Sequence, residues 1–283
     1  MTFAIVTPSY NKVRYLRRCA LSVMEQERPG VDYWLLDSCS TDGSAEVIER
    51  LRTEYAGRLH IVVEKDHGQT DAINRGFALA KGEIMGWLNA DDFYLPHTLA
   101  RVEQCFQEHP EAGMVYGGAR ILDGDLRLLN NYPVQPHDPK VMRSWQYIPQ
   151  PSCFWRRAVW EAVGPLDTTL NWVMDWDFFI RVSDRFPAVF LSEVLSEAVQ
   201  DGQHKTATGG PPKIRELAMI SRRYGGWSNP TNLYCHYVLF LHWILRPWLN
   251  NPATALAAQR WMERLKAYAL TVANKVFHRQ VMA

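Results

Sequence analysis

The sequence lacks the features that define several large classes of protein. Its five cysteines are scattered and include no Cys-x-x-Cys pair, which excludes a disulfide scaffold or a cysteine zinc site and favours a reducing cytosol. No run of about 18 apolar residues is present, so no membrane-spanning helix is expected. No basic leader with an apolar core precedes the first strand-like run, so no signal peptide is expected. The net charge of +1 provides no global field for nucleic acid, and we expect no nucleic-acid partner.

The two common nucleotide-binding fingerprints are also missing. No Gly-x-Gly-x-x-Gly follows the first predicted strand and no Gly-Lys-Ser/Thr loop occurs, which argues against kinases, GTPases and nicotinamide dehydrogenases. Residues 7–11 (TPSYN) occupy that place and offer a flat ring and hydrogen-bonding groups instead of a glycine cradle. A phosphate bound there needs another source of positive charge, and a divalent cation is the simplest one.

The composition is that of an ordinary globular chain, but its charge is unevenly spread. The 283 residues are 47% hydrophobic and 22% charged, which excludes disorder, collagen and coiled coil. Residues 211–283 hold ten Lys/Arg and two acids, a net of +8, so residues 1–210 carry −7. The basic segment is rich in tryptophan and reads as a separate helical extension.

Strand and helix signals alternate through the first ninety residues. Short apolar runs predict strands at 3–6, 33–36, 61–63 and 84–88, and amphipathic spacing predicts helices at 12–26, from 42, and at 69–80. This alternation predicts a parallel sheet flanked by helices, with ligands bound beyond the carboxyl ends of the strands. Further along, we expect helices at 96–108, 158–163 and 173–185, strands within 113–132 and 189–199, and loops at 133–151 and 200–212.

Polar clusters follow all four predicted strands, and three of them carry carboxylates. Asp37 follows the second strand, Asp66 the third, and the pair Asp91-Asp92 the fourth. Adjacent carboxylates repel unless a cation lies between them and a ligand, and Mg²⁺ or Mn²⁺ accepts one or two carboxylates plus phosphate oxygens. The alternative is that Asp91 or Asp92 caps a turn before Leu95.

A second acidic cluster is Asp175-Trp176-Asp177. On a helix the two carboxylates point about 200° apart, so they cannot share a face. One can face a cleft while the other caps the helix or pairs with Arg181, four residues after Asp177.

These motifs, taken in order, resemble the family 2 glycosyltransferases with a GT-A fold, in particular bacterial enzymes of cell-surface polysaccharide synthesis. The resemblance covers about residues 3–210. Its motifs are residues 7–11, 37–43 (DSCSTDG), 64–76, 82–84 leading to 89–92 (NADD), 150–157, 164–167, and 175–177 with Arg181.

The resemblance implies a fold and a division of the chain. The fold is α/β, with a mostly parallel, Rossmann-like central sheet flanked by helices. Residues 1–210 form the glycosyltransferase domain, with a nucleotide-sugar half (1–95) and an acceptor half (96–210), and residues 211–283 form the basic, aromatic helical extension.

The resemblance also assigns roles to residues. The donor nucleotide would contact Pro8, Tyr10, Asp37, Asp66, Asp71, Arg75 and Asp91. Asp92 would be the ligand of Mn²⁺ or Mg²⁺, and Asp175 would be the catalytic base that accepts the proton of the acceptor hydroxyl. Gln150 and Trp172 fall where the acceptor is usually bound.

One departure leaves the metal site open. Many relatives carry a histidine six residues before a Lys-Thr-x-x-Gly segment, and here Asp201 lies close to that position while His204 lies three residues later. Either residue is a candidate second ligand of the metal ion. The alternative is that this segment is a polar loop with no role in metal binding.

The expected activity is inverting transfer of a sugar from a nucleoside-diphosphate sugar to a hydroxyl of a glycan or a lipid-linked acceptor. A UDP-sugar is favoured because a carboxylate such as Asp37 accepts from the N3–H of uracil, although guanine offers N–H donors as well. The alternatives are a sugar-nucleotide pyrophosphorylase and a non-catalytic sugar-nucleotide-binding subunit of a polysaccharide assembly complex.

The C-terminal extension has three interpretations. Residues 233–245 are apolar nearly all round, which is typical of a helix packed in a core. Tryptophans and basic residues within 231–266 also suit an interfacial helix on an anionic cytoplasmic leaflet, which would make a cytoplasmic protein peripheral at the inner membrane face. Oligomerisation through the same surface is the third interpretation.

Overall fold

The computed structural model describes residues 1–26, 30–202 and 205–267. They fold into two compact units. The first unit holds residues 1–137 and 147–202, and the second holds 138–146 with the C-terminal residues from 205 onward.

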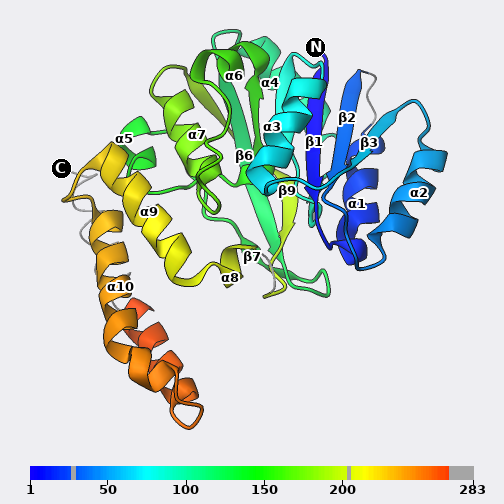
Figure 1. Ribbon diagram of the computed structural model, residues 1–283. Coiled ribbons are helices and arrows are strands. Elements are labelled where there is room, and N and C mark those ends of the chain that lie inside the picture. Colours follow the sequence, from blue (N-terminus) through cyan, green and yellow to red (C-terminus); the bar gives the residue numbers. More distant parts are fainter. Residues whose placement is uncertain (27–29, 203–204, 268–283) are drawn as a thin grey trace. The chain divides into compact units, whose positions relative to one another are not determined.

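The first unit begins with alternating strands and helices, as predicted (Figure 1). Their bounds are β1 (Phe3–Ser9), α1 (Val13–Met24), β2 (Val31–Asp37), α2 (Ser44–Glu54), β3 (Leu59–Val63), α3 (Gln69–Leu79) and β4 (Ile84–Trp87). The strands pair in parallel in the order β3-β2-β1-β4. All four carboxyl ends therefore meet at one edge, which is where a ligand binds in such sheets.

The second half of this unit extends the sheet with strands of both directions. Its elements are β5 (Asp92–Tyr94), α4 (Thr98–Glu108), β6 (Met114–Leu122), β7 (Leu128–Asn131), the 3₁₀ turn η1 (Gln150–Ser152), β8 (Cys153–Arg156), α6 (Arg157–Val163), α7 (Met174–Ser183) and β9 (Ala188–Val199). The order continues β8-β6-β9-β5, with β7 beside β6. The first unit is thus α/β in class. Its sheet contains both parallel and antiparallel pairs, since β8 runs antiparallel to β4 and to β6.

The helices cover both faces of this sheet. Phe3 and Ile5 point to one face, where they join the core formed with α1, α2 and α4. Val6 lies in the alternate register and meets α3 so closely that a Cβ at Gly76 would stand 2.5 Å from it. On the α3 face, α6 and α7 add an aromatic cluster in which the Trp155 and Phe178 ring centroids are 4.8 Å apart. This packing fixes α7 against the sheet.

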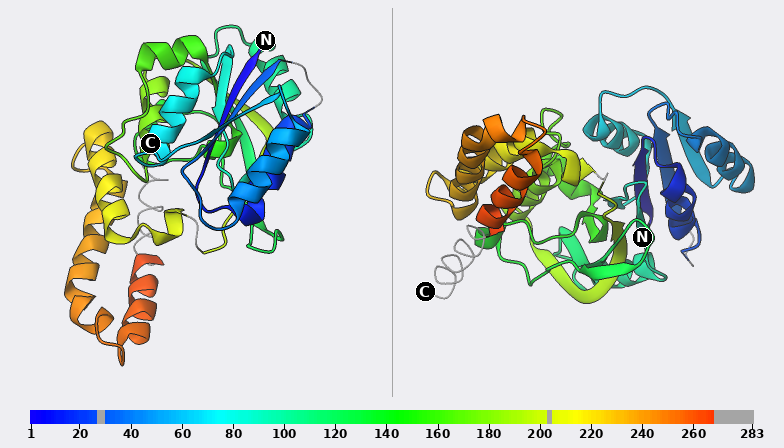
Figure 2. Two further views of the ribbon diagram at one scale, coloured as in Figure 1. Left: turned by 45° about the vertical axis from the view of Figure 1, so that its right-hand side comes forward. Right: turned by 90° about the horizontal axis from the view of Figure 1, so that it is seen from below.

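The second unit is helical. Its elements are α5 (Pro139–Met142), α8 (Lys205–Thr208), α9 (Gly210–Gly225) and α10 (Pro230–Leu249), and residues 255–267 are also helical. Helices α9 and α10 lie side by side (Figure 2). Asn229 caps α10 through its side-chain oxygen, and its amide nitrogen donates to Ser144 Oγ at 2.9 Å. Among the described residues no helix is both long and apolar enough to cross a bilayer.

Several elements were not predicted from the sequence, among them α5 and η1, which begin in the segment 133–151 that was predicted as loop. Strand β5 has only three residues and begins on the charged Asp92, and β8 has four, so neither gives a clear alternating pattern. The segment 200–212, predicted as loop, contains α8 and the start of α9. The two prolines after Gly210 occupy the first turn of α9, where a missing N–H costs no hydrogen bond.

Candidate active site

One buried carboxylate joins the carboxyl ends of β1 and β2 through hydrogen bonds. Asp37 is only 3% exposed. Its Oδ2 accepts hydrogen bonds from the hydroxyls of Ser9 and Ser40 at 2.9 and 2.7 Å, and its Oδ1 accepts from the Ser40 amide at 2.8 Å. A carboxylate has about four acceptor positions, so one remains on Oδ1 for a ligand donor.

An exposed ring stands beside this carboxylate. Tyr10 is 53% exposed, and the Lys65 ammonium lies 5.1 Å from its ring centroid. The hydroxyl of Ser38 accepts from the Asp66 amide at 3.3 Å, which joins the β2 and β3 exits. Tyr10, Asp37 and Asp66 thus lie at the carboxyl ends of three neighbouring strands, and Pro8 is buried in β1.

Two further predicted donor residues, Asp71 and Arg75, lie in α3. Asp71 Oδ2 accepts from the His67 amide at 3.1 Å, so this carboxylate closes the turn that follows β3. Arg75 pairs with Glu64 at 2.6 Å. Its guanidinium thus forms an ion pair with a carboxylate that follows β3, at the carboxyl edge of the sheet.

The acidic pair follows β4 in a tight turn. The Asp92 amide donates to the Asn89 carbonyl at 2.9 Å, and the Asn89 side-chain amide donates to Asp92 Oδ2 at 2.9 Å. Asp91 forms an ion pair with Lys12, with 2.6 Å between Nζ and Oδ2. The amides of Tyr94 and Leu95 donate to Ser22 Oγ and to the Leu195 carbonyl, so neither aspartate caps these amides in the turn before Leu95.

Asp92 is a buried carboxyl group whose ionised form is only partly stabilised by its neighbours. It is 6% exposed. Burial raises its pKa well above the usual range, and the neighbouring Asp91 raises it further, while hydrogen bonds from Asn89 and the Val199 backbone and the charge of Lys12 offset only part of this. A carboxylate in such a place gains from a nearby cation.

This chemistry fits a hard divalent cation. Asp91 and Asp92 offer the one or two carboxylates that Mg²⁺ or Mn²⁺ takes from a protein, with water and phosphate oxygens completing the shell. Asp201 follows β9, whose Ala198 pairs with Asp92, and the Tyr15 hydroxyl approaches it at 3.5 Å. No three metal-ligating side chains converge within the described ranges, and His204 lies outside them. Which of Asp201 and His204 contributes therefore stays a prediction.

The second acidic cluster separates its two carboxylates as expected. Asp177 is 2% exposed and pairs with Arg181 at 2.9 Å, while Arg181 also donates to the carbonyls of Val163 and Gly164. Asp177 thus anchors α7. Asp175 is partly exposed in the first turn of α7, near Tyr132 and Cys153, whose pKa values are raised by burial and then by its charge.

A hydrogen-bond network that the sequence did not predict joins the start of α3, the turn after β4 and η1 through Asn89. The Asn89 amide also donates to Gln150 Oε1 at 3.0 Å, and its oxygen accepts from Gln69 at 2.6 Å. Gln150 Nε2 in turn donates to the Trp87 carbonyl at 2.8 Å. Gln150, expected to bind acceptor, thus has its amide tied to the acidic turn, whereas Trp172 lies partly exposed in the loop before α7.

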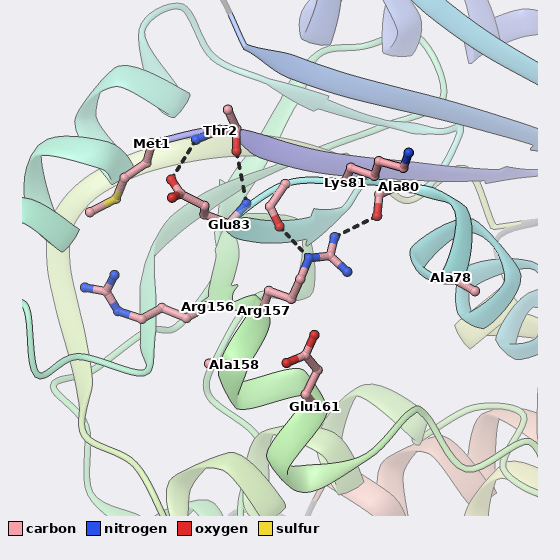
Figure 3. A pocket seen from close by; sticks show the side chains of 11 residues that line it. Met1, Thr2, Ala78, Ala80, Lys81, Glu83, Arg156, Arg157, Ala158 and Glu161 are labelled. Atoms are coloured by element: carbon pink, nitrogen blue, oxygen red, sulfur yellow. Dashed lines mark hydrogen bonds between the residues drawn. The ribbon is translucent and has the colours of Figure 1, made fainter.

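A cavity of about 720 Å³ lies elsewhere, where β1 and β4 begin (Figure 3). Arg157 borders it and donates to the carbonyls of Gly82 and Ala80 at 2.7 and 2.8 Å, and Glu83 accepts from the Thr2 amide. None of the predicted site residues lines it. Glu83 thus joins the starts of β1 and β4, and Arg157 holds the segment that leads into β4.

The family assignment follows from comparison with known proteins. The profile of the family described as Glycosyl transferase family 2 matches residues 4–157. The chain belongs to the family 2 glycosyltransferases. The match contains every predicted donor residue together with Asp91, Asp92 and Gln150, whereas Asp175 and Trp172 lie beyond it.

Two relatives illustrate the likeness in sequence. A glycosyltransferase of Nostoc sp. is 30% identical over 178 residues, which cover 59% of this chain and 54% of that protein. A PGL/p-HBAD biosynthesis glycosyltransferase of Mycobacterium bovis is 31% identical over 180 residues, 63% of this chain and 68% of that one. The chain therefore spans about half the length of the Nostoc relative.

Solved structures of glycosyltransferases share the GT-A fold of this chain. S. aureus TarS 1–349 in complex with UDP-GlcNAc gives a TM-score of 0.63 at 16% identity, covering 93% of this chain and 91% of that one. The mannosyltransferase PcManGT from Pyrobaculum calidifontis, in complex with GDP-Man and Mn²⁺, gives 0.61 at 18% identity, covering 96% and 86%.

The burial of Asp92 predicts a stability penalty that a neutral side chain removes. Because its pKa is raised in the folded state, the native protein holds a proton that the unfolded chain has lost, and stability falls as pH rises from about 4 through the folded pKa. Metal-free Asp92→Asn should therefore melt higher than wild type at neutral pH, by about 2–4 °C for each kcal/mol removed. Calorimetry should show the difference shrinking toward pH 4.

Asp177→Asn is the matched control, since Asp177 is equally buried but paired with Arg181. This variant should melt lower than wild type at neutral pH. A metal-free Asp92→Asn protein that melts lower as well would contradict the account of the acidic turn.

Proposed function

We propose that this glycosyltransferase moves a sugar, with inversion, from a nucleoside-diphosphate sugar to a hydroxyl of a glycan or lipid-linked acceptor in surface polysaccharide synthesis. The observation that carries the proposal is the buried Asp92 beside Asp91 at the carboxyl edge of the sheet. A diphosphate and its cation are the ligand that this negative, water-poor corner suits. The proposed donor and acceptor halves are residues 1–95 and 96–210.

A UDP-sugar is the proposed donor. Tyr10 provides an exposed ring against which a base can stack, and Asp37 has one acceptor position left, which suits the N3–H of uracil. Asp66, Asp71 and Arg75 lie at the same edge, where the ribose and phosphates would extend. Support comes from the fold shared with the UDP-GlcNAc complex of TarS, while the GDP-Man complex of PcManGT makes GDP-sugars the second choice.

Asp92 would hold the cation, Mn²⁺ or Mg²⁺, and Asp91 would contact the ribose or donor sugar. When bound, the ion supplies positive charge that neutralises the departing diphosphate. Asn89 holds Asp92 Oδ2 in place, and Gln150 and Gln69 hold Asn89. This arrangement ties the position of Asp92 to the start of α3 and to η1.

Asp175 is the proposed general base. Its carboxylate accepts the proton of the acceptor hydroxyl as that oxygen bonds to the anomeric carbon, and the bond from this carbon to the diphosphate oxygen breaks with its electron pair. One displacement converts an α-linked donor into a β-linked product. The position of the partly exposed Asp175 in the first turn of α7, a helix anchored by the Asp177–Arg181 pair, supports the assignment.

Two substitutions separate the proposed roles. Asp175→Asn should keep Mn²⁺-dependent UDP binding and lose transfer by about 10²–10⁴-fold, the usual contribution of a general base. Asp92→Asn should lose the Mn²⁺-dependent part of UDP binding itself. Isothermal titration measures binding, release of UDP measures transfer, and NMR of the product reports the anomeric configuration.

Transfer by Asp175→Asn at near the wild-type rate would remove Asp175 as the base. Formation of a sugar 1-phosphate would support a pyrophosphorylase instead. Donor binding without turnover with any acceptor hydroxyl would favour the non-catalytic subunit.

We also propose that the second unit binds the anionic inner surface of the membrane. One face of α10 packs inward through Cys235, Val238 and Leu241. The other face exposes five large apolar side chains, Leu233, Phe240, Trp243, Ile244 and Trp248. These positions fall on one side of the helix at its 3.6-residue period, and a continuous apolar face of this kind marks a binding surface.

The charge around this face favours a lipid surface over a second protein copy. Arg246 at the end of α10 is exposed, as are Arg260, Trp261 and Arg264 on the following helix. Tryptophan with arginine suits the boundary between headgroups and acyl chains, and each basic residue near an anionic surface contributes about 1 kcal/mol. A lipid-linked acceptor would lie in the same surface.

Vesicle flotation tests this surface. Wild type should float with phosphatidylcholine vesicles that contain phosphatidylglycerol at low salt, and less as salt rises. Trp243→Ser with Trp248→Ser should abolish flotation. Leu128→Ser with Leu129→Ser, which changes two exposed residues of β7, is the control and should float like wild type. Wild type that stays in the pellet, or that instead forms a dimer sensitive to the tryptophan substitutions, would contradict the membrane proposal.

A further inference from the structure

The acidic turn already contains a cation of the chain's own, the ammonium of Lys12. Its Nζ lies 2.6 Å from Asp91 Oδ2, and both side chains are largely shielded, at 23% and 14% exposed. Burial lowers the pKa of Lys12, but attraction by Asp91, Asp201 and Asp92 outweighs burial and leaves the pKa raised. The ammonium is thus paired with Asp91 and attracted by Asp92 in the same turn and by Asp201 after β9.

Helix α1 itself provides no group that stabilises the positive charge of Lys12. Lys12 is the N-cap residue of α1, its side chain makes no capping hydrogen bond, and the first turn of α1 contains no acid. A positive charge at a helix N-terminus opposes the helix dipole. The compensation comes from the acidic turn, so the pairing of Lys12 with Asp91 is the interaction that holds the ammonium here.

We infer that Lys12 is the resting counter-ion of the Asp91–Asp92 turn, and that its ammonium must leave Asp91 when a divalent cation binds to Asp92 and the donor contacts Asp91. This inference rests on the proposed function. A cation on Asp92 and the ammonium on the adjacent Asp91 repel each other, so the ion pair weakens metal binding in the absence of nucleotide. The lysine stem is flexible, and the diphosphate of a donor offers the displaced ammonium new negative partners.

The consequence is coupling between metal and donor. Without nucleotide, a divalent ion on Asp92 repels the ammonium paired with Asp91, and no diphosphate is present to attract the ammonium elsewhere. With nucleotide, the ammonium exchanges one anion for another. Lys12 therefore makes each ligand strengthen the binding of the other, and by linkage the factor is the same in both directions.

Binding of Mn²⁺ to the nucleotide-free protein tests this role directly, because free Mn²⁺ is measured by electron paramagnetic resonance without any turnover. Lys12→Met should bind Mn²⁺ about tenfold more tightly than wild type, a typical size for coupling between neighbouring sites. UDP should strengthen Mn²⁺ binding about tenfold less in Lys12→Met than in wild type. Lys12→Arg keeps the charge and should restore the weak, UDP-dependent behaviour.

Arg14→Met is the matched control. Arg14 lies two residues away and also pairs with an aspartate, Asp125, but both side chains are exposed at 60% and 63%. This variant removes the same charge from the same helix end and should leave Mn²⁺ binding near the wild-type value. Circular dichroism melts of all the variants establish that they are folded.

The possible failures are distinguishable. If wild type binds Mn²⁺ in the presence of UDP but Lys12→Met shows no gain without nucleotide, the role of Lys12 is wrong and the proposed function stands. If neither protein binds Mn²⁺ with or without UDP, both the counter-ion role and the metal-dependent donor site are wrong. If Arg14→Met gains as much as Lys12→Met, the effect is one of general charge, and the specific pairing is overturned.

Discussion

The site depends on how the protein accommodates two adjacent carboxyl groups, of which one is buried. Asp92 is buried at the start of β5, where it pairs with β9, and burial opposes its ionisation. Asn89 donates to Asp92, and Lys12 pairs with Asp91, so the two carboxyl groups are held by different groups. Neither partner offsets the burial of Asp92 fully, because its pKa stays raised. The folded protein therefore keeps a corner whose most favourable partner is an added cation.

The rest of the fold places ligand-binding groups around this corner. Parallel pairing of β3, β2, β1 and β4 brings Tyr10, Asp37, Asp66 and the acidic turn to one edge. The antiparallel β8 continues the sheet from β4, so η1 reaches Asn89 through Gln150. Helix α7 is anchored by its buried Asp177–Arg181 pair, while Asp175 remains partly exposed near Tyr132 and Cys153. The residues proposed for the donor and for the acceptor are thus positioned by one sheet and by the elements that follow its strands.

Much of this was predictable because the first half of the chain consists of regular βαβ units. Apolar runs located β1 to β4, and the strand-end rule located Asp37, Asp66 and Asp91-Asp92. The separate orientations of Asp175 and Asp177 followed from helix geometry alone. Other features depend on contacts between distant residues and leave no local pattern: the three-residue β5, the hydrogen bonds that unite Gln69, Asn89 and Gln150, and the ion pair between Lys12 and Asp91.

The most direct test of the cation-bridged donor site is the thermal shift of the full chain with UDP, dTDP, GDP, CDP and ADP, each with and without Mn²⁺. A ligand that binds the native state raises the melting temperature by mass action. The account predicts a shift with UDP that requires Mn²⁺ and disappears in Asp92→Asn. A UDP shift of equal size without Mn²⁺, or no shift with any nucleotide, would contradict it.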